Sequence, residues 1–280
     1  MSENETLLLG LIAGGTIFLG LPIARIRSLG PRTRQTLTSV AVGVLLFLIW
    51  DVLTHAYSPL DRALGDYHAG SAGLGPVFGY GALFFAGIAL GLISLVYYEA
   101  WLGRRARPMP SGPGAMAADR KLSGLQAWSP ARRLSLLIAV GIGLHNFGEG
   151  LAIGGSAAAG AIGLATVLVI GFSLHNATEG FGIIAPLAGE SERPSWGFLA
   201  LMGAIGGGPT FVGTVIGRQF NSTAVGVLFL TLAAGSILYV VIQLIGIALK
   251  TGRKEQLYWG ILLGLMAGFV TDMVVTAGGA

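Results

Sequence analysis

This 280-residue chain contains one short phrase twice, as Leu144-His145-Asn146-Phe147-Gly148-Glu149-Gly150 and again as Leu174-His175-Asn176-Ala177-Thr178-Glu179-Gly180. Each copy lies inside a long run of apolar residues. Within each copy the His and the Glu are four positions apart, which places both on one face of a helix, one turn from each other. Ionisable side chains in apolar segments of membrane-spanning length are costly and are usually retained for function. The repeated phrase therefore predicts a functional site between two membrane helices.

The two helices are predicted to form an antiparallel hairpin, because Gly, Ala and Ser predominate between them, from residue 154 to residue 163. In an antiparallel pair, residues at equal depth have a constant sum of residue numbers. That sum is 324 for His145 with Glu179, and it is again 324 for Glu149 with His175. We therefore expect the chain to reverse near residue 162 and each His to face the Glu of the other helix.

Two imidazoles and two carboxylates at one depth suit a divalent transition metal such as Zn, Fe or Mn. Asn146 and Asn176 directly follow the two His residues, so each lies beside the His/Glu face of its helix. There the amide oxygens could ligate the ion or orient the carboxylates. Interhelical hydrogen bonding alone would also explain the two Asn residues. The predicted metal ligands are His145, Asn146, Glu149, His175, Asn176 and Glu179.

The composition indicates a polytopic membrane protein. Hydrophobic residues make up 53% of the chain, charged residues make up 11%, and the mean hydropathy is +0.75. A soluble domain carries about 25% charged residues. The chain has no Cys, which excludes disulfides, thiolate metal ligands and Cys nucleophiles. The pI of about 9.6 could suggest nucleic acid, but the basic residues lie in loops, so membrane topology explains them better and no nucleic-acid partner is expected.

Eight apolar runs are long enough to span a bilayer as helices. We therefore predict an all-α fold with eight transmembrane helices in a single domain, residues 1–280. A polar loop with Asp61, Asp66 and His68 is expected after the second run. The predicted spans are Leu7–Ile26, Gln35–Ala56, Pro76–Leu102, Ala131–Ile153, Ala161–Leu187, Ser195–Gly217, Ala224–Lys250 and Leu257–Ala277.

The distribution of positive charge predicts the orientation. The connections after the first, third, fifth and seventh spans, taken with the span ends that adjoin them, hold 15 of the 17 Lys and Arg residues. The positive-inside rule places these connections in the cytoplasm, including a long Pro- and Gly-rich loop at about residues 103–130. Both termini are then on the non-cytoplasmic side of the cell membrane. The apolar run from Leu7 follows an acidic start and does not resemble a cleavable signal peptide.

Several residues outside the repeated phrase are also candidates for a functional or structural role. Asp51 and His55, one turn apart near the outer end of the second span, could guide ions from outside toward the central site. Glu99 is interpreted as an interfacial ion-pair partner of neighbouring Arg residues. Most of the 46 Gly residues are expected to permit close helix packing. The stretch from Gly206 to Pro209 is expected to bend its helix and free backbone carbonyls.

The two phrases and the topology resemble the ZIP (zinc/iron-regulated transporter-like) family of divalent metal transporters. In that family, His-Asn-x-x-Glu-Gly motifs on the fourth and fifth of eight helices form a metal site midway across the membrane. The resemblance covers the topology of the whole chain, but the motif match is confined to those two helices. It implies a bundle with inverted pseudo-symmetry and movement of metal into the cytoplasm.

The chain departs from the family pattern in three places. Gly148 and Thr178 stand where the family often has Pro before the motif Glu. Gly208 stands where many members have a Glu before Pro in the sixth helix that helps to hold a second metal, so the number of bound ions, one or two, stays open. The loop at 103–130 has no His, whereas many relatives have a His-rich loop.

The expected function is transport of a divalent transition-metal ion, zinc first, with iron, manganese or cadmium as alternatives. The expected partners are the metal and the lipid bilayer, and the small residues permit a homodimer. No prosthetic group and no enzymatic activity are expected. Two alternatives stay open: a membrane-embedded zinc-dependent hydrolase, and a metal-sensing relative that does not transport.

Overall fold

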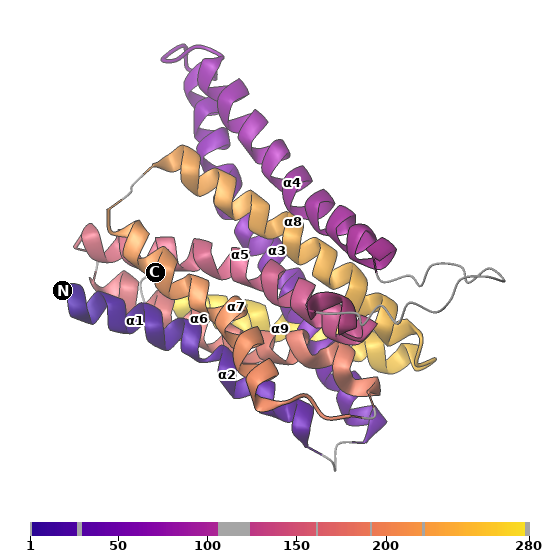
Figure 1. Cartoon of the computed structure of the whole chain (residues 1–280). Helices are drawn as coiled ribbons and strands as arrows, with labels where there is room; N and C mark the ends of the chain where they lie inside the picture. Colours follow the sequence, from indigo (N-terminus) through magenta and orange to yellow (C-terminus); the bar gives the residue numbers. More distant parts are fainter. Residues whose placement is uncertain are drawn as a thin grey trace.

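The computed structural model describes residues 2–26, 30–105, 124–160, 162–190, 192–219 and 222–277. Within these ranges the chain is helical and contains no strand (Figure 1). Eight of the described helical segments are long and apolar enough to cross a membrane. The prediction of a polytopic helical protein is therefore confirmed at this level. The elements are α1 (Glu3–Gly15), α2 (Ile17–Gly20), η1 (Leu21–Arg25), α3 (Pro31–His68), α4 (Gly75–Arg105), η2 (Gly124–Ala127), α5 (Pro130–Ala158), α6 (Ile162–Ile184), η3 (Ala185–Gly189), α7 (Trp196–Gly217), α8 (Thr223–Leu249) and α9 (Lys254–Ala277).

The first span begins earlier than predicted and is interrupted. Ser2 caps α1 through a capping box with Glu5, so the helix starts in the acidic segment that precedes the apolar run. The helix is interrupted at Thr16, and the chain continues as α2 and η1 to Arg25. The interruption lies beside the central pair of helices, because α1 and α2 both pack against α6.

The second span is much longer than predicted. The expected loop after Ala56 is wrong, since α3 continues as one helix to His68 and contains Pro59. The apolar stripe of Ala56, Leu60 and Ala63 continues at helical spacing and is buried, which explains the extension. Figure 1 shows the connection between α3 and α4 standing clear of the other helices.

The central hairpin reverses close to the expected point. Helix α5 ends at Ala158, α6 begins at Ile162, and Gly160 has the positive φ of 77° that ends a helix in a tight turn. The predicted break at 154–163 is wrong in its first half, where α5 remains helical. Gly154 serves packing instead, because a Cβ there would run into the backbone of α7 near Thr214.

The helices pack in two groups. One group comprises α1, α2, α5, α6 and α7, the other comprises α3, α4, α8 and α9, and α5 with α8 and α3 with α6 connect them. Backbone-to-backbone approach at Gly residues brings helices together within both groups, as at Gly150 against α7, Gly43 against α9 and Gly91 against α8. The prediction that Gly residues permit close packing is confirmed at these positions.

The long loop predicted at about 103–130 lies mostly outside the described residues. Its first part belongs to α4, which continues to Arg105. Its last part contains η2, and Pro130 is already the first residue of α5. Residues 106–123 are outside the described ranges.

Candidate metal site

Three of the predicted ligands converge between α5 and α6. The nearest ligand atoms of His145, Glu149 and His175 all lie within 4.8 Å of one another. His145 Nε2 lies 3.1 Å from Glu149 Oε1, and His175 Nε2 contacts the same oxygen. His145 and Glu149 are only 3% and 4% exposed, and His175 is half-buried. A pair of imidazoles around one carboxylate is a donor set suited to a transition metal.

The facing arrangement is confirmed as a direct contact for one pair, and for the other pair the structure shows an electrostatic interaction between His145 and Glu179 across the hairpin. Glu149 and His175 meet across the hairpin as the constant sum predicts. His145, however, contacts Glu149 on its own helix, and Glu179 is not part of the 4.8 Å group. The constant sum of residue numbers determines the depth of a residue in the hairpin, but it does not determine how far the helix is rotated about its own axis. Both imidazoles can therefore turn toward one carboxylate, which makes the cluster asymmetric.

Glu179 is buried beside the cluster. It is 1% exposed, and the side-chain amide of Asn146 is its hydrogen-bonding neighbour in the described part of the chain. Its carboxylate interacts electrostatically with His145, His175 and Glu149. The second oxygen of Glu149 is buried and unpartnered. Two buried carboxylates beside each other are unfavourable, and a cation between them would remove much of that cost.

The two Asn side chains are anchored by their nitrogens. Asn146 Nδ2 donates to the backbone oxygen of Gly206 on α7 at 3.0 Å. Asn176 Nδ2 donates to the backbone oxygen of Ala13 on α1 at 3.0 Å. Both side chains are fully buried, and both Oδ1 atoms lack a partner among the described residues. Interhelical hydrogen bonding is therefore confirmed for both residues, and it leaves each amide oxygen available to a cation or its water.

The stretch from Gly206 to Pro209 is helical throughout, because α7 runs without interruption to Gly217. The Gly206 oxygen accepts the hydrogen bond of Asn146, so this backbone carbonyl takes part in an interhelical contact. Pro209 cannot donate a backbone hydrogen bond, which loosens this turn. A Cβ at Gly208, where the resembling family often has Glu, would meet no atom within 4 Å.

A cavity of about 450 Å³ connects the cluster with the predicted ion path. Its lining includes His145, Glu149 and His175 at one end and Asp51 and His55 at the other. The side chain of His55 is 70% exposed and lies 3.4 Å from the Asp51 carboxylate. The structure therefore places the predicted path residues and the cluster along one cavity.

Sequence reasoning missed one acidic residue of this cavity. Asp272 on α9 lines the cavity with Thr271 and Thr276. The available signal was a single carboxylate in an otherwise apolar span, the same signal that singled out Asp51 on α3.

The opposite side of the cluster is closed by apolar packing. Ile138, Ile142 and Ile183 are fully buried within the main hydrophobic core. These residues lie on α5 and α6, one to two turns from the cluster and away from the cavity. The cluster is therefore reached from one end of the bundle.

No protein-family model matches the chain. No curated protein matches it either. The likeness to ZIP transporters consequently rests on the two His-Asn-x-x-Glu-Gly motifs and on the arrangement of the spans.

Proposed function

We propose that this chain transports divalent transition-metal ions, zinc first, through the cluster between α5 and α6. The observation that carries the proposal is the convergence of His145, Glu149 and His175 at the closed end of a cavity inside a bundle of membrane-length helices. A structural ion pair would not need two imidazoles on one buried carboxylate. It would also not need a second buried carboxylate, Glu179, beside the first.

The donor set favours a first-row transition metal. Imidazole nitrogen is a borderline-soft donor that suits Zn, Fe and Mn, whereas Mg and Ca prefer oxygen ligands alone. Glu149 and Glu179 together balance the charge of a divalent ion, which lowers the cost of holding it inside the bundle. Asn146 and Asn176 complete the site as amide oxygens at its edge.

The cavity provides the route by which the metal ion reaches the cluster. Asp51 and Asp272 contribute two carboxylates to its wall, and a cavity with negatively charged walls raises the local concentration of cations. His55 lies at the end of the second predicted span that is distant from the basic connections. The positive-inside rule thus assigns the cavity mouth, and both termini, to the non-cytoplasmic side.

Release on the other side requires the packing around Ile138, Ile142 and Ile183 to open. The division of the helices into two groups offers a means, because one group can shift against the other while contacts within each group persist. The metal would then move toward the cytoplasm. The near-repeat of the two motifs supports inverted symmetry of the bundle.

The test is zinc uptake into liposomes that hold the purified protein, with iron, manganese and cadmium as competitors. Uptake should be lost in the double variant H145A/H175A and retained in H68A. His68 is a suitable control because it is an exposed His at the end of α3, far along the chain from the cluster. Retained uptake in folded H145A/H175A would refute the proposal. A wild type that binds zinc without moving it would favour the sensor, and zinc-dependent cleavage of lipid or peptide would favour the hydrolase.

A further inference from the structure

A second pocket lies at the end of the bundle that carries the basic connections. It has a volume of about 560 Å³ and is formed by the end of η1, the first turn of α3, and the segment between η3 and α7. These segments are far apart in the chain, but η1 and η3 are in direct contact. The pocket is separate from the cavity of the metal cluster, with which it shares no lining residue.

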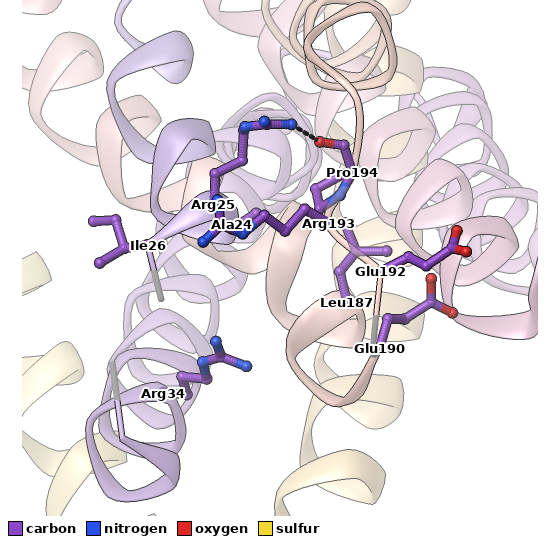
Figure 2. A pocket seen from close by; sticks show the side chains of 9 residues that line it. All are labelled: Ala24, Arg25, Ile26, Arg34, Leu187, Glu190, Glu192, Arg193 and Pro194. Atoms are coloured by element: carbon purple, nitrogen blue, oxygen red, sulfur yellow. Dashed lines mark hydrogen bonds between the residues drawn. The ribbon is translucent and has the colours of Figure 1, made fainter. Parts of the chain in front are cut away.

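Three Arg side chains dominate the charge of this pocket. Arg25 comes from η1, Arg34 from α3, and Arg193 from the segment before α7. Figure 2 shows Arg34 and Arg193 on one side of the pocket, whereas Glu190 and Glu192 point to the other side. The arginines therefore face the pocket from three separate segments.

The two carboxylates at the rim are engaged by another cation. Arg132 on α5 lies with Nε 3.6 Å from Glu190 Oε2 and with Nη2 4.0 Å from Glu192 Oε2. Arg132 does not line the pocket. Arg132 offsets one of the two carboxylates, and the three arginines of the lining outnumber the other, so the net charge at the pocket is positive. A positive pocket disfavours a metal cation and favours an anion.

The wall formed by Arg25 is fixed by the fold. Its Nη1 donates to the backbone oxygen of Pro194, as Figure 2 shows, and its guanidinium lies 4.8 Å from the ring centre of Trp196. Held in this way, the guanidinium keeps its place at the rim without a ligand. Guanidinium groups bind phosphate oxygens through paired hydrogen bonds, which makes Arg a preferred phosphate ligand.

The depth of the pocket indicates the source of the anion. Trp196 is 60% exposed, and Ile26 at the rim is also exposed. An exposed Trp at the end of a membrane-length helix marks the level of the lipid headgroups. Basic pockets between membrane helices at this level bind anionic headgroups.

We propose that this pocket binds the phosphate group of an anionic lipid. Arg34 belongs to the helix group of α3, whereas Arg25 and Arg193 adjoin the group of α2 and α7. A phosphate held between Arg34 and Arg193, with Arg25 forming the fixed wall, bridges the two groups at this end of the bundle. It stabilises the arrangement in which the metal cluster is closed on this side.

The experiment measures binding of phosphatidylglycerol by native mass spectrometry of the full chain purified in a neutral detergent. The variant R34Q/R193Q should bind the lipid at least tenfold more weakly than wild type. The matched control is R253Q/K254Q, which removes two positive charges from exposed residues at the start of α9 that do not line the pocket. A third variant, R34K/R193K, keeps the positive charge, and its affinity for the lipid should lie between those of R34Q/R193Q and wild type.

Inorganic phosphate is then added as a competitor. Displacement of the lipid shows that the pocket also accepts free phosphate, and retention of the lipid assigns the site to a headgroup with its acyl chains. Equal affinities in R34Q/R193Q and R253Q/K254Q, both folded by circular dichroism, would overturn the proposal. Zinc transport does not enter this readout, so the lipid site and the metal function can fail separately.

Discussion

Replacing Asn146 or Asn176 with alanine should weaken metal binding by more than it destabilises the fold. Each substitution removes one hydrogen bond to a backbone oxygen of a neighbouring helix, both at 3.0 Å. Hydrogen bonds between membrane helices contribute about 0.6 kcal/mol on average and about 1.7 kcal/mol at most. We expect a loss of unfolding free energy in that range for either variant.

The effect on the metal should be larger, because each variant also removes a buried amide oxygen beside the cluster. Loss of a group that supports metal ligands weakens binding about 10- to 100-fold. That range corresponds to about 1.4 to 2.8 kcal/mol of binding free energy. The zinc Kd of N146A and N176A should therefore rise by at least about tenfold.

The assay pairs two measurements on each purified variant in detergent micelles: the free energy of unfolding by denaturant titration, and the zinc Kd by competition with a chromophoric chelator. S135A is the matched control. Ser135 lies on the same helix as Asn146, is fully buried, and donates to the backbone oxygen of Ile183 at 2.6 Å. It should lose stability and keep its zinc Kd. If N146A and N176A behave like S135A, the Asn residues are anchors between helices and not part of the metal site.

Three further outcomes are expected. Gly150→Ala should strongly lower the thermal unfolding midpoint, because the added Cβ would run into the backbone of Thr210. Gly148→Ala should hardly change the midpoint, because its Cβ would have its nearest neighbour at 3.6 Å. Similar shifts of the midpoint in the two variants would contradict this packing. Glu99→Ala should reduce the unfolding free energy by about 1.5 kcal/mol, since it removes the charged acceptor of the Tyr239 hydroxyl, and Glu99→Gln should recover part of the loss in the same denaturant titration. Zinc affinity should fall as the pH is lowered from about 8 to about 5, since bound imidazoles must be deprotonated, and titration calorimetry that finds no pH dependence would exclude His ligation.

The cluster was predictable because its determinants are local. The spacing of His145 and Glu149 fixes their shared face, and the Gly- and Ala-rich connection fixes the direction of the return helix. The contact of Glu149 with His175 follows from these two facts. The position of Glu179 does not follow, because it depends on the rotation of α6, which α1, α2 and α3 determine through packing.

Contacts between distant helices were less accessible to sequence reasoning. The partners of Asn146 and Asn176 are backbone oxygens, and every residue offers one, so the sequence contains no sign of which is used. Glu99 gives another example. It was expected to pair with neighbouring Arg residues, but it accepts hydrogen bonds from Tyr239 and Gln243 on α8.

The extension of α3 could have been found. Pro59 favoured a loop, but Pro removes only one helical hydrogen bond, and water can satisfy the freed carbonyl near a helix end. The buried stripe of Ala56, Leu60 and Ala63 was the stronger signal. The prediction of a loop weighed one residue type above a continuing period.

The length of α3 also provides a direct way to read the orientation of the protein. At 38 residues it is about 57 Å long, and even a tilt of about 40° leaves about 14 Å beyond a hydrocarbon layer of about 30 Å. The exposed polar residues Asp61, Asp66 and His68 place that excess in water at the C-terminal end of the helix. Because the chain has no native Cys, a single cysteine introduced at that end would be the only thiol to label. A thiol reagent that cannot cross the membrane would reach it from one side alone, and that side would fix the direction of all eight spans.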